Sequence, residues 1–134
     1  MSKIYLDACI VIYFIEKHFD YADKIEALIN NLGGNDALCF SALIRLECLV
    51  MPLRTNDKTL QSLYESFFKT QQMLEMTVEV FDQAAQLRAG FNSLKTPDAL
   101  HLATALHYNC DEFWTNDNRL KSVAPSLIKN ILLP

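Results

Sequence analysis

Residues 94–106 of the chain read LKTPDALHLATAL. Thr96 suits the N-cap of a helix, where its hydroxyl oxygen accepts a backbone hydrogen bond, and Pro97 suits the first helical position, where no N–H is needed. Apolar residues then recur at helical spacing, at Ala99, Leu102, Ala103 and Leu106. The stretch therefore predicts an amphipathic helix that lies on a core, with small alanines that allow close approach.

Asp98 falls in the first turn of this predicted helix, at the edge of the core. An acid in this position complements the helix dipole, which is worth roughly 0.3–1 kcal/mol and requires no further function. A functional role for Asp98 depends on which other acids of the chain come close to it.

The composition is that of one globular domain. A chain of 134 residues can bury a single substantial core, so we expect one domain over residues 1–134. About half of the residues are apolar, a slight excess that fits a buried sheet, a subunit interface or both.

Charge and cysteine usage narrow the classes of function. The net charge of −4 argues against a surface that binds nucleic acid simply by being basic, so a substrate with phosphates needs a cation or a local cluster of Lys and Arg. The four cysteines form no Cys-x-x-Cys pair and are interpreted as buried thiols in a reducing cytosol. We expect neither a secretion signal nor a membrane span, and hence a cytoplasmic protein.

Short β-prone runs alternate with helical patterns along the chain. The predicted strands are 3–6, 37–40, 74–78, 112–115 and, as a last edge strand, 129–133. The predicted helices include 20–32, 42–51, 57–70, 79–93 and the one that begins near Thr96, and Pro52 is expected to end the helix over 42–51. This alternation predicts an α/β fold, a three-layer α/β/α sandwich with a mainly parallel central sheet, and an antiparallel helical hairpin at about 42–70.

Four acids occur near the expected carboxyl ends of strands or at the start of a helix. Asp7 and Asp117 come at the ends of predicted strands and Glu47 shortly after another, while Asp98 opens a helix. Three of them also have a structural interpretation: Asp7 as an N-cap, Glu47 as half of a salt bridge, and Asp117 as an Asx-turn or N-cap. Because sites in parallel sheets lie outside the carboxyl ends of the strands, the four acids can converge on one edge.

Convergence of carboxylates requires a compensating positive charge. At an effective dielectric of about 20, two carboxylates about 4 Å apart repel each other by about 4 kcal/mol. Oxygen-only ligands select a hard cation, Mg²⁺ or Mn²⁺, and the absence of a His and Cys set at ligand spacing argues against a dedicated zinc site. Such a cation can bind a phosphate oxygen, lower the pKa of a bound water and stabilise the leaving oxygen, which is the chemistry of phosphodiester hydrolysis.

Four blocks of the sequence, taken together, resemble a PIN domain: Leu6–Tyr13, Ser41–Glu47, Thr96–Ala103 and Thr115–Leu120. They are most similar to the VapC-type toxins of type II toxin–antitoxin pairs. The blocks occur in the order of that family and span essentially the whole chain.

This resemblance implies a metal-dependent endoribonuclease with an RNA substrate. The acids that correspond to those of the family are Asp7, Glu47, Asp98 and Asp117, with Thr115 as a supporting hydroxyl. The resemblance also implies a homodimer, and inhibition by a small cognate antitoxin whose C-terminal segment lies across the active-site groove.

The chain departs from the family beside Asp7. The family usually carries a hydroxyl or amide residue one or two positions after its first acid, whereas this chain has Ala8 and Cys9. The missing polar side chain is expected to loosen how Asp7 or a bound water is held.

Other polar residues near the acids have mainly structural interpretations. His101 follows Asp98 by one helical turn and is interpreted as a surface histidine, the alternative being contact with substrate or a carboxylate. Arg45, Lys95 and Arg119 each neighbour an acid in sequence. Exposed salt bridges account for them as well as contacts with RNA phosphates or with the acids of an inhibitor.

Two other classes of function are alternatives to the nuclease. A haloacid-dehalogenase-like phosphatase also places an Asp nucleophile after its first strand, but it carries a second Asp two residues later, where this chain has Cys9. The other alternative is a non-catalytic protein that keeps the PIN fold and binds RNA or a partner without cutting.

Overall fold

The computed structural model describes residues 2–132 of the chain. Within those residues the elements follow one another as β1 (Lys3–Leu6), α1 (Ala8–Ile15), α2 (Ala22–Asn30), β2 (Ala37–Ser41), α3 (Ala42–Arg54), α4 (Lys58–Thr70), β3 (Gln72–Leu74), α5 (Val78–Gly90), α6 (Thr96–His107), β4 (Glu112–Thr115), the 3-10 helix η1 (Asn118–Ser122) and β5 (Ile128–Asn130). Strands and helices alternate, as the sequence predicts.

The five strands form one sheet in the order β3-β2-β1-β4-β5, and every neighbouring pair is parallel. The central strand is β1, whose Ile4 lies opposite Leu38 of β2 on one side and Glu112 of β4 on the other. The prediction of a mainly parallel sheet is confirmed. A parallel arrangement brings the carboxyl ends of all five strands to the same edge of the sheet.

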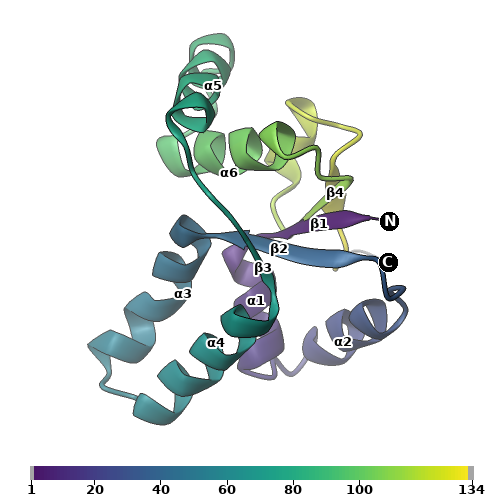
Figure 1. Cartoon of the computed structure of the whole chain (residues 1–134), viewed down its shortest axis with the longest axis vertical. Coiled ribbons are helices and arrows are strands. Elements are labelled where there is room, and N and C mark those ends of the chain that lie inside the picture. The colour runs from purple at the N-terminus through teal and green to yellow at the C-terminus, as the bar shows by residue number, and fades with distance from the viewer. Residues whose placement is uncertain (1, 133–134) are drawn as a thin grey trace.

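Helices cover both faces of this sheet and complete a three-layer α/β/α sandwich. Figure 1 shows α5 and α6 above the sheet in the view and α1 to α4 below it. The strands between the two helical layers are largely buried; in β1 and β4 all residues but the first are buried. The predicted sandwich is therefore also confirmed.

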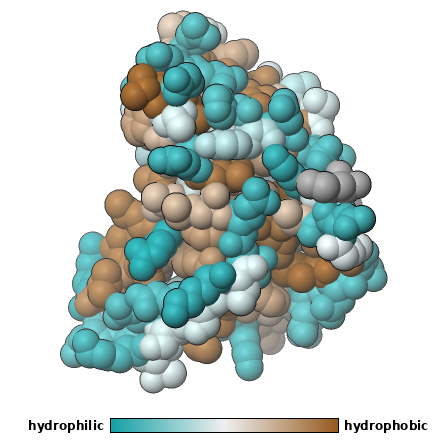
Figure 2. Space-filling model, in the orientation of Figure 1, coloured by the Kyte–Doolittle hydropathy of each residue, from teal (hydrophilic) through white to brown (hydrophobic). Residues whose placement is uncertain are grey.

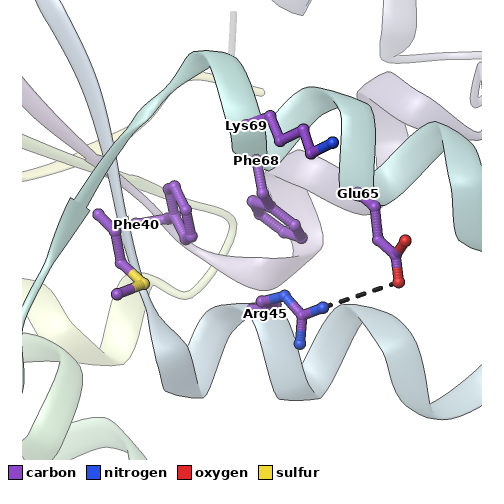
Figure 3. Close-up of a pocket in the computed structure, with 6 residues that line it drawn as sticks. Phe40, Arg45, Glu65, Phe68 and Lys69 are labelled. Carbon is purple, nitrogen blue, oxygen red and sulfur yellow. Dashed lines mark ion pairs between the residues drawn. The ribbon is translucent and has the colours of Figure 1, made fainter.

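Helices α3 and α4 form the expected hairpin and run back along each other (Figure 1). Arg45 of α3 and Glu65 of α4 form an ion pair with an N–O distance of 3.7 Å. The pair lies at a pocket of about 350 Å³ that Phe40 and Phe68 also line (Figure 3). Arg45 thus has the role of a salt bridge across the hairpin.

Pro52 does not end α3, which continues to Arg54. A proline in a helix removes one hydrogen bond to the carbonyl four residues earlier, and this loss is tolerated here close to the end of the helix. The last turn is closed by backbone bonds from Thr55 to Met51 and from Asp57 to Pro52, at 2.9 and 2.8 Å. The prediction that the helix stops before Pro52 is wrong.

Several predicted boundaries also shift. The third strand is Gln72–Leu74 rather than 74–78, because Thr77 instead caps α5 by accepting a hydrogen bond from the Val80 N–H. The last edge strand is Ile128–Asn130 rather than 129–133, of which Leu133 lies outside the described residues. The helix predicted over 79–93 ends at Gly90.

Helix α6 begins one residue earlier than expected, with Lys95 rather than Thr96 at the N-cap. The Thr96 hydroxyl is instead the acceptor of a 2.9 Å hydrogen bond from Arg88 of α5. All residues from Ala99 to Ala105 are buried. Helix α6 therefore has no solvent face along its centre, since α5 packs along it on the side away from the sheet (Figure 1).

The apolar excess of the sequence lies partly on the surface. Exposed apolar side chains of α3 are Leu46, Val50, Met51 and Leu53. Figure 2 shows brown, hydrophobic side chains at the left of the view, where Figure 1 places α3. Among residues 2–132, no helix has both the length and the apolar character that a membrane crossing requires.

Candidate active site

The carboxyl ends of β1 and β4 bring Asp7 and Asp117 to the same edge of the sheet. The two strands are adjacent and parallel, with Leu6 opposite Trp114, and the Asp7 N–H continues the ladder by donating to the Trp114 carbonyl at 3.0 Å. Asp117 follows the end of β4 by two residues and caps η1. The topology thus places these two acids side by side.

Thr115 connects Asp7 and Asp117 directly. Its hydroxyl, which is fully buried, donates to Oδ2 of Asp7 at 2.6 Å and accepts the backbone N–H of Asp117 at 3.0 Å. The other oxygen of Asp7 accepts the Ala8 N–H at 2.8 Å. One buried hydroxyl therefore fixes both acids relative to each other.

The environment of Asp7 opposes its negative charge. Burial raises the pKa of Asp7, although the hydrogen bond from Thr115 acts in the opposite direction. An ionised carboxylate in such a position is stabilised by a cation. A positively charged ligand would therefore stabilise the ionised form of Asp7.

The absence of a hydroxyl or amide side chain at Ala8 and Cys9 does not leave Asp7 unheld. Thr115 and the Ala8 N–H occupy both carboxylate oxygens. Burial raises the pKa of Cys9 to about 12, so its side chain stays a neutral thiol at neutral pH. Both oxygens of Asp7 thus have a donor, one of them from the neighbouring strand β4, although positions 8 and 9 provide no polar side chain.

Asp98 and Asp117 share the guanidinium group of Arg119. Nη2 of Arg119 lies 2.6 Å from Oδ2 of Asp117 and 3.7 Å from Oδ2 of Asp98. Asp98 is also held by its own helix start, where Oδ2 accepts the Lys95 N–H at 3.0 Å. Of the three basic residues named in the sequence analysis, Arg119 is the one whose side chain forms ion pairs with Asp98 and Asp117.

Glu47 reaches the site from α3 and binds His101 of α6. The distance from Nε2 of His101 to Oε1 of Glu47 is 2.8 Å. His101 is 4% exposed, so its interpretation as a surface histidine is wrong. The alternative, contact with a carboxylate, is what the structure shows.

A chain of hydrogen bonds continues from His101 into the core. Nδ1 of His101 lies 2.8 Å from the Tyr5 hydroxyl, which lies 2.8 Å from the Ser41 hydroxyl. Burial raises the pKa of Tyr5, which keeps its proton available for donation. With Glu47 ionised and His101 neutral, every donor has an acceptor: Ser41 donates to Tyr5, Tyr5 to Nδ1, and Nε2 to Glu47.

Tyr5 and Ser41 are supporting residues that the sequence interpretation missed. Tyr5 precedes Asp7 by two residues, and the period of two in a strand puts both side chains on one face of β1. Ser41 is the N-cap of α3 and accepts the Ile44 N–H at 3.3 Å. The spacing of two residues from Asp7 could therefore have indicated that Tyr5 supports the site. The contact between Ser41 and Tyr5 depends instead on the pairing of β1 with β2.

The acids form a linked edge and not a compact ligand cage. Asp7, Asp117 and Asp98 are joined through Thr115 and Arg119, and Glu47 is joined to His101. Within the part of the chain that the structure describes, no three His, Cys, Asp or Glu side chains are grouped so that they could hold a metal ion.

The donor set nevertheless fits a hard divalent cation. All four acids supply carboxylate oxygens, which Mg²⁺ and Mn²⁺ prefer over nitrogen or sulfur. The guanidinium of Arg119 already marks a position where positive charge is stabilised between Asp98 and Asp117. A cation in that position must replace an arginine contact.

These observations define a class of protein, namely a parallel α/β sandwich with an acidic site at the carboxyl edge of its sheet. The family model of the PIN domain matches residues 4–125. The chain belongs to the PIN domain family. No curated protein sequence matches the chain significantly.

Solved structures share this fold at low sequence identity. The chain is similar to VapBC-1 from nontypeable Haemophilus influenzae, with a TM-score of 0.83, 14% identity and coverage of 98% of this chain and 100% of that one. A toxin–antitoxin complex from Klebsiella pneumoniae gives a TM-score of 0.76 at 17% identity, over 96% and 97% of the two chains. The sarcin–ricin loop cleaving toxin VapC20 from Mycobacterium tuberculosis gives 0.75 at 11% identity, over 90% and 95%.

Removal of the Tyr5 hydroxyl tests the buried hydrogen-bond chain. Tyr5→Phe leaves the Ser41 hydroxyl and Nδ1 of His101 without their shared partner, so the free energy of unfolding should fall by about 1–3 kcal/mol. Urea unfolding measures this change. Tyr108→Phe, which removes an exposed hydrogen bond to the Glu75 carbonyl that water can replace, is the control and should cost less than Tyr5→Phe. Equal effects of the two substitutions would contradict the network.

The pH dependence of stability tests the burial of Asp7. Because the folded pKa is raised, the contribution of this carboxyl to stability is fullest below its unfolded pKa of about 3.9 and is lost as the pH rises through the folded pKa. In EDTA, Asp7→Asn should therefore gain stability relative to the wild type as the pH rises above about 4, as measured by urea unfolding. The exposed substitution Glu65→Gln should show no such gain, and a pH-independent difference for Asp7→Asn would refute the assignment.

Proposed function

We propose that this protein is a metal-dependent endoribonuclease that hydrolyses RNA phosphodiester bonds, acting as the toxin of a type II toxin–antitoxin pair. The observation that carries the proposal is the linked set of acids at the carboxyl edge of a PIN-family sheet. Asp7 and Asp117 share Thr115, and Asp98 and Asp117 share Arg119. Such an edge concentrates negative charge where ligands of parallel sheets bind.

In this proposal Asp7, Asp98, Asp117 and Glu47 hold Mg²⁺ or Mn²⁺. When bound, the ion supplies charge compensation for the phosphate and lowers the pKa of a water molecule. The net charge of −4 makes such a cation the natural means for a phosphate-bearing substrate to approach.

The chain's own residues provide orientation. Thr115 and the Ala8 N–H hold the two oxygens of Asp7, while the Lys95 N–H holds Asp98 at the start of α6. His101 fixes one oxygen of Glu47, whose side chain is 33% exposed, so the carboxylate remains open to solvent and can accept a proton from an attacking water.

Similar structures support the proposed biological role. The Klebsiella pneumoniae structure is a toxin–antitoxin complex, and the Mycobacterium tuberculosis protein is described as a toxin that cleaves the sarcin–ricin loop. We propose by analogy that this chain binds a small antitoxin, forms a homodimer and acts in the cytoplasm.

The competing proposal is a PIN-fold protein that binds RNA or a partner without cutting. The specific observation in its favour is Arg119, whose guanidinium pairs with both Asp98 and Asp117. The two functions differ in a direct way: the nuclease yields shorter RNA products, and the binding protein yields a complex with intact RNA.

Cleavage of labelled RNA tests the nuclease. We expect products with Mg²⁺ or Mn²⁺ and none with EDTA, and a loss of activity on the order of 100-fold or more in Asp98→Asn. Asn keeps an oxygen that can accept the Lys95 N–H, so the variant should remain folded, as judged by circular dichroism. Glu65→Gln, a substitution in the partly exposed ion pair between α3 and α4, is the control that should keep its activity. Cleavage in EDTA, or full activity of Asp98→Asn, would contradict the proposal.

Light scattering tests the homodimer. The purified chain should elute with about twice its monomer mass of 15.3 kDa at micromolar concentration. A monomer mass that persists over a concentration series would exclude the dimer while leaving the nuclease proposal intact.

A further inference from the structure

Arg119 binds Asp117 through a fork of hydrogen bonds. Its Nε donates to Oδ1 at 3.0 Å and to Oδ2 at 3.1 Å, and its Nη2 donates to Oδ2 at 2.6 Å. The Arg119 backbone N–H also donates to Oδ1 of Asp117 at 3.0 Å. This planar arrangement is the geometry in which arginine binds a carboxylate most specifically.

The same guanidinium reaches a second acid on another element. Nη2 lies 3.7 Å from Oδ2 of Asp98, which belongs to the first turn of α6. The contact with Asp117 lowers the pKa of that carboxyl. Arg119 thus serves two carboxylates that come from different parts of the chain.

Both acids keep a contact that does not involve the guanidinium: Oδ1 of Asp117 also accepts the Arg119 backbone N–H. The Asp98 carboxylate accepts the Lys95 N–H, and the backbone of Asp117 donates to the buried Thr115 hydroxyl. The side chain of Arg119, by contrast, is 56% exposed, against 21% for Asp98 and 25% for Asp117. The guanidinium is therefore the most exposed member of this group, and its departure leaves each acid with a backbone N–H contact.

We propose that Arg119 is a built-in competitor for the metal ion: its guanidinium holds the place of the cation between Asp98 and Asp117 and leaves Asp98 when the ion binds. This inference rests on the proposed metal-dependent function. It makes Arg119 a determinant of metal affinity, because the ion gains only the difference between its own attraction to the acids and the arginine contacts that it replaces. The device also keeps the acids compensated while no metal is bound.

Titration of Mn²⁺ into the purified protein, followed by calorimetry, tests the competition without RNA. Arg119→Gln removes the competing charge and should bind Mn²⁺ roughly three- to tenfold more tightly than the wild type. Arg119→Lys keeps the charge but lacks the planar fork, and should fall between the two. Lys121→Gln, an exposed change of equal charge in the same 3-10 helix, is the matched control and should shift the affinity by less than about twofold.

Thermal unfolding with and without Mn²⁺ provides a second readout and shows that each variant is folded. Because the ion stabilises the folded state by mass action, its effect on the melting temperature should be larger in Arg119→Gln than in the wild type. An unchanged or weaker Mn²⁺ affinity in Arg119→Gln, or an effect equal to that of Lys121→Gln, overturns the competition and leaves the nuclease proposal standing. Absence of Mn²⁺ binding in every variant overturns both.

Discussion

The need to compensate crowded carboxylates is the constraint on which the site depends. Two carboxylates about 4 Å apart repel by about 4 kcal/mol at an effective dielectric of about 20, a large part of the stability of a small domain. A parallel sheet nonetheless directs Asp7 and Asp117 to one edge. Each acid is therefore tied to a specific neighbour: Asp7 to Thr115, Glu47 to His101, and both Asp98 and Asp117 to Arg119.

The packing of α6 makes this arrangement possible. Because α5 covers the side of α6 away from the sheet, the residues from Ala99 to Ala105 are all buried, including His101. A buried imidazole needs partners for both nitrogens, and it finds Tyr5 on one side and Glu47 on the other. The hydrogen bonds of the buried His101 thus also fix the Glu47 side chain. They couple the stability of the domain to the position of this acid.

The sequence predicted the layers of the fold better than the hydrogen-bond and ion-pair partners of the four acids. The strand–helix alternation gave the parallel sheet and the hairpin, because hydrophobic period and capping residues are local properties. Burial of His101 was missed because periodicity describes one helix, whereas α5 covers the other face of α6 from elsewhere in the chain. The role of Arg119 was left open for the same reason: the distance from its guanidinium to Asp98 is set by the fold and not by spacing in the sequence. Pro52 was misjudged because the cost of a proline depends on how near it lies to the helix end.

The partners of the acids differ in charge, and this difference affects how each would respond to a bound cation. Thr115 is a neutral donor, so it can keep its hydrogen bond to Asp7 when a cation arrives. Arg119 carries a full positive charge, and it cannot share Asp98 with a divalent ion without strong repulsion. In the proposed competition, Thr115 is therefore a permanent support, whereas Arg119 is a replaceable one. If the proposed metal-dependent function holds, the affinity of the site for an ion is set by how firmly one exposed guanidinium is bound to Asp98 and Asp117.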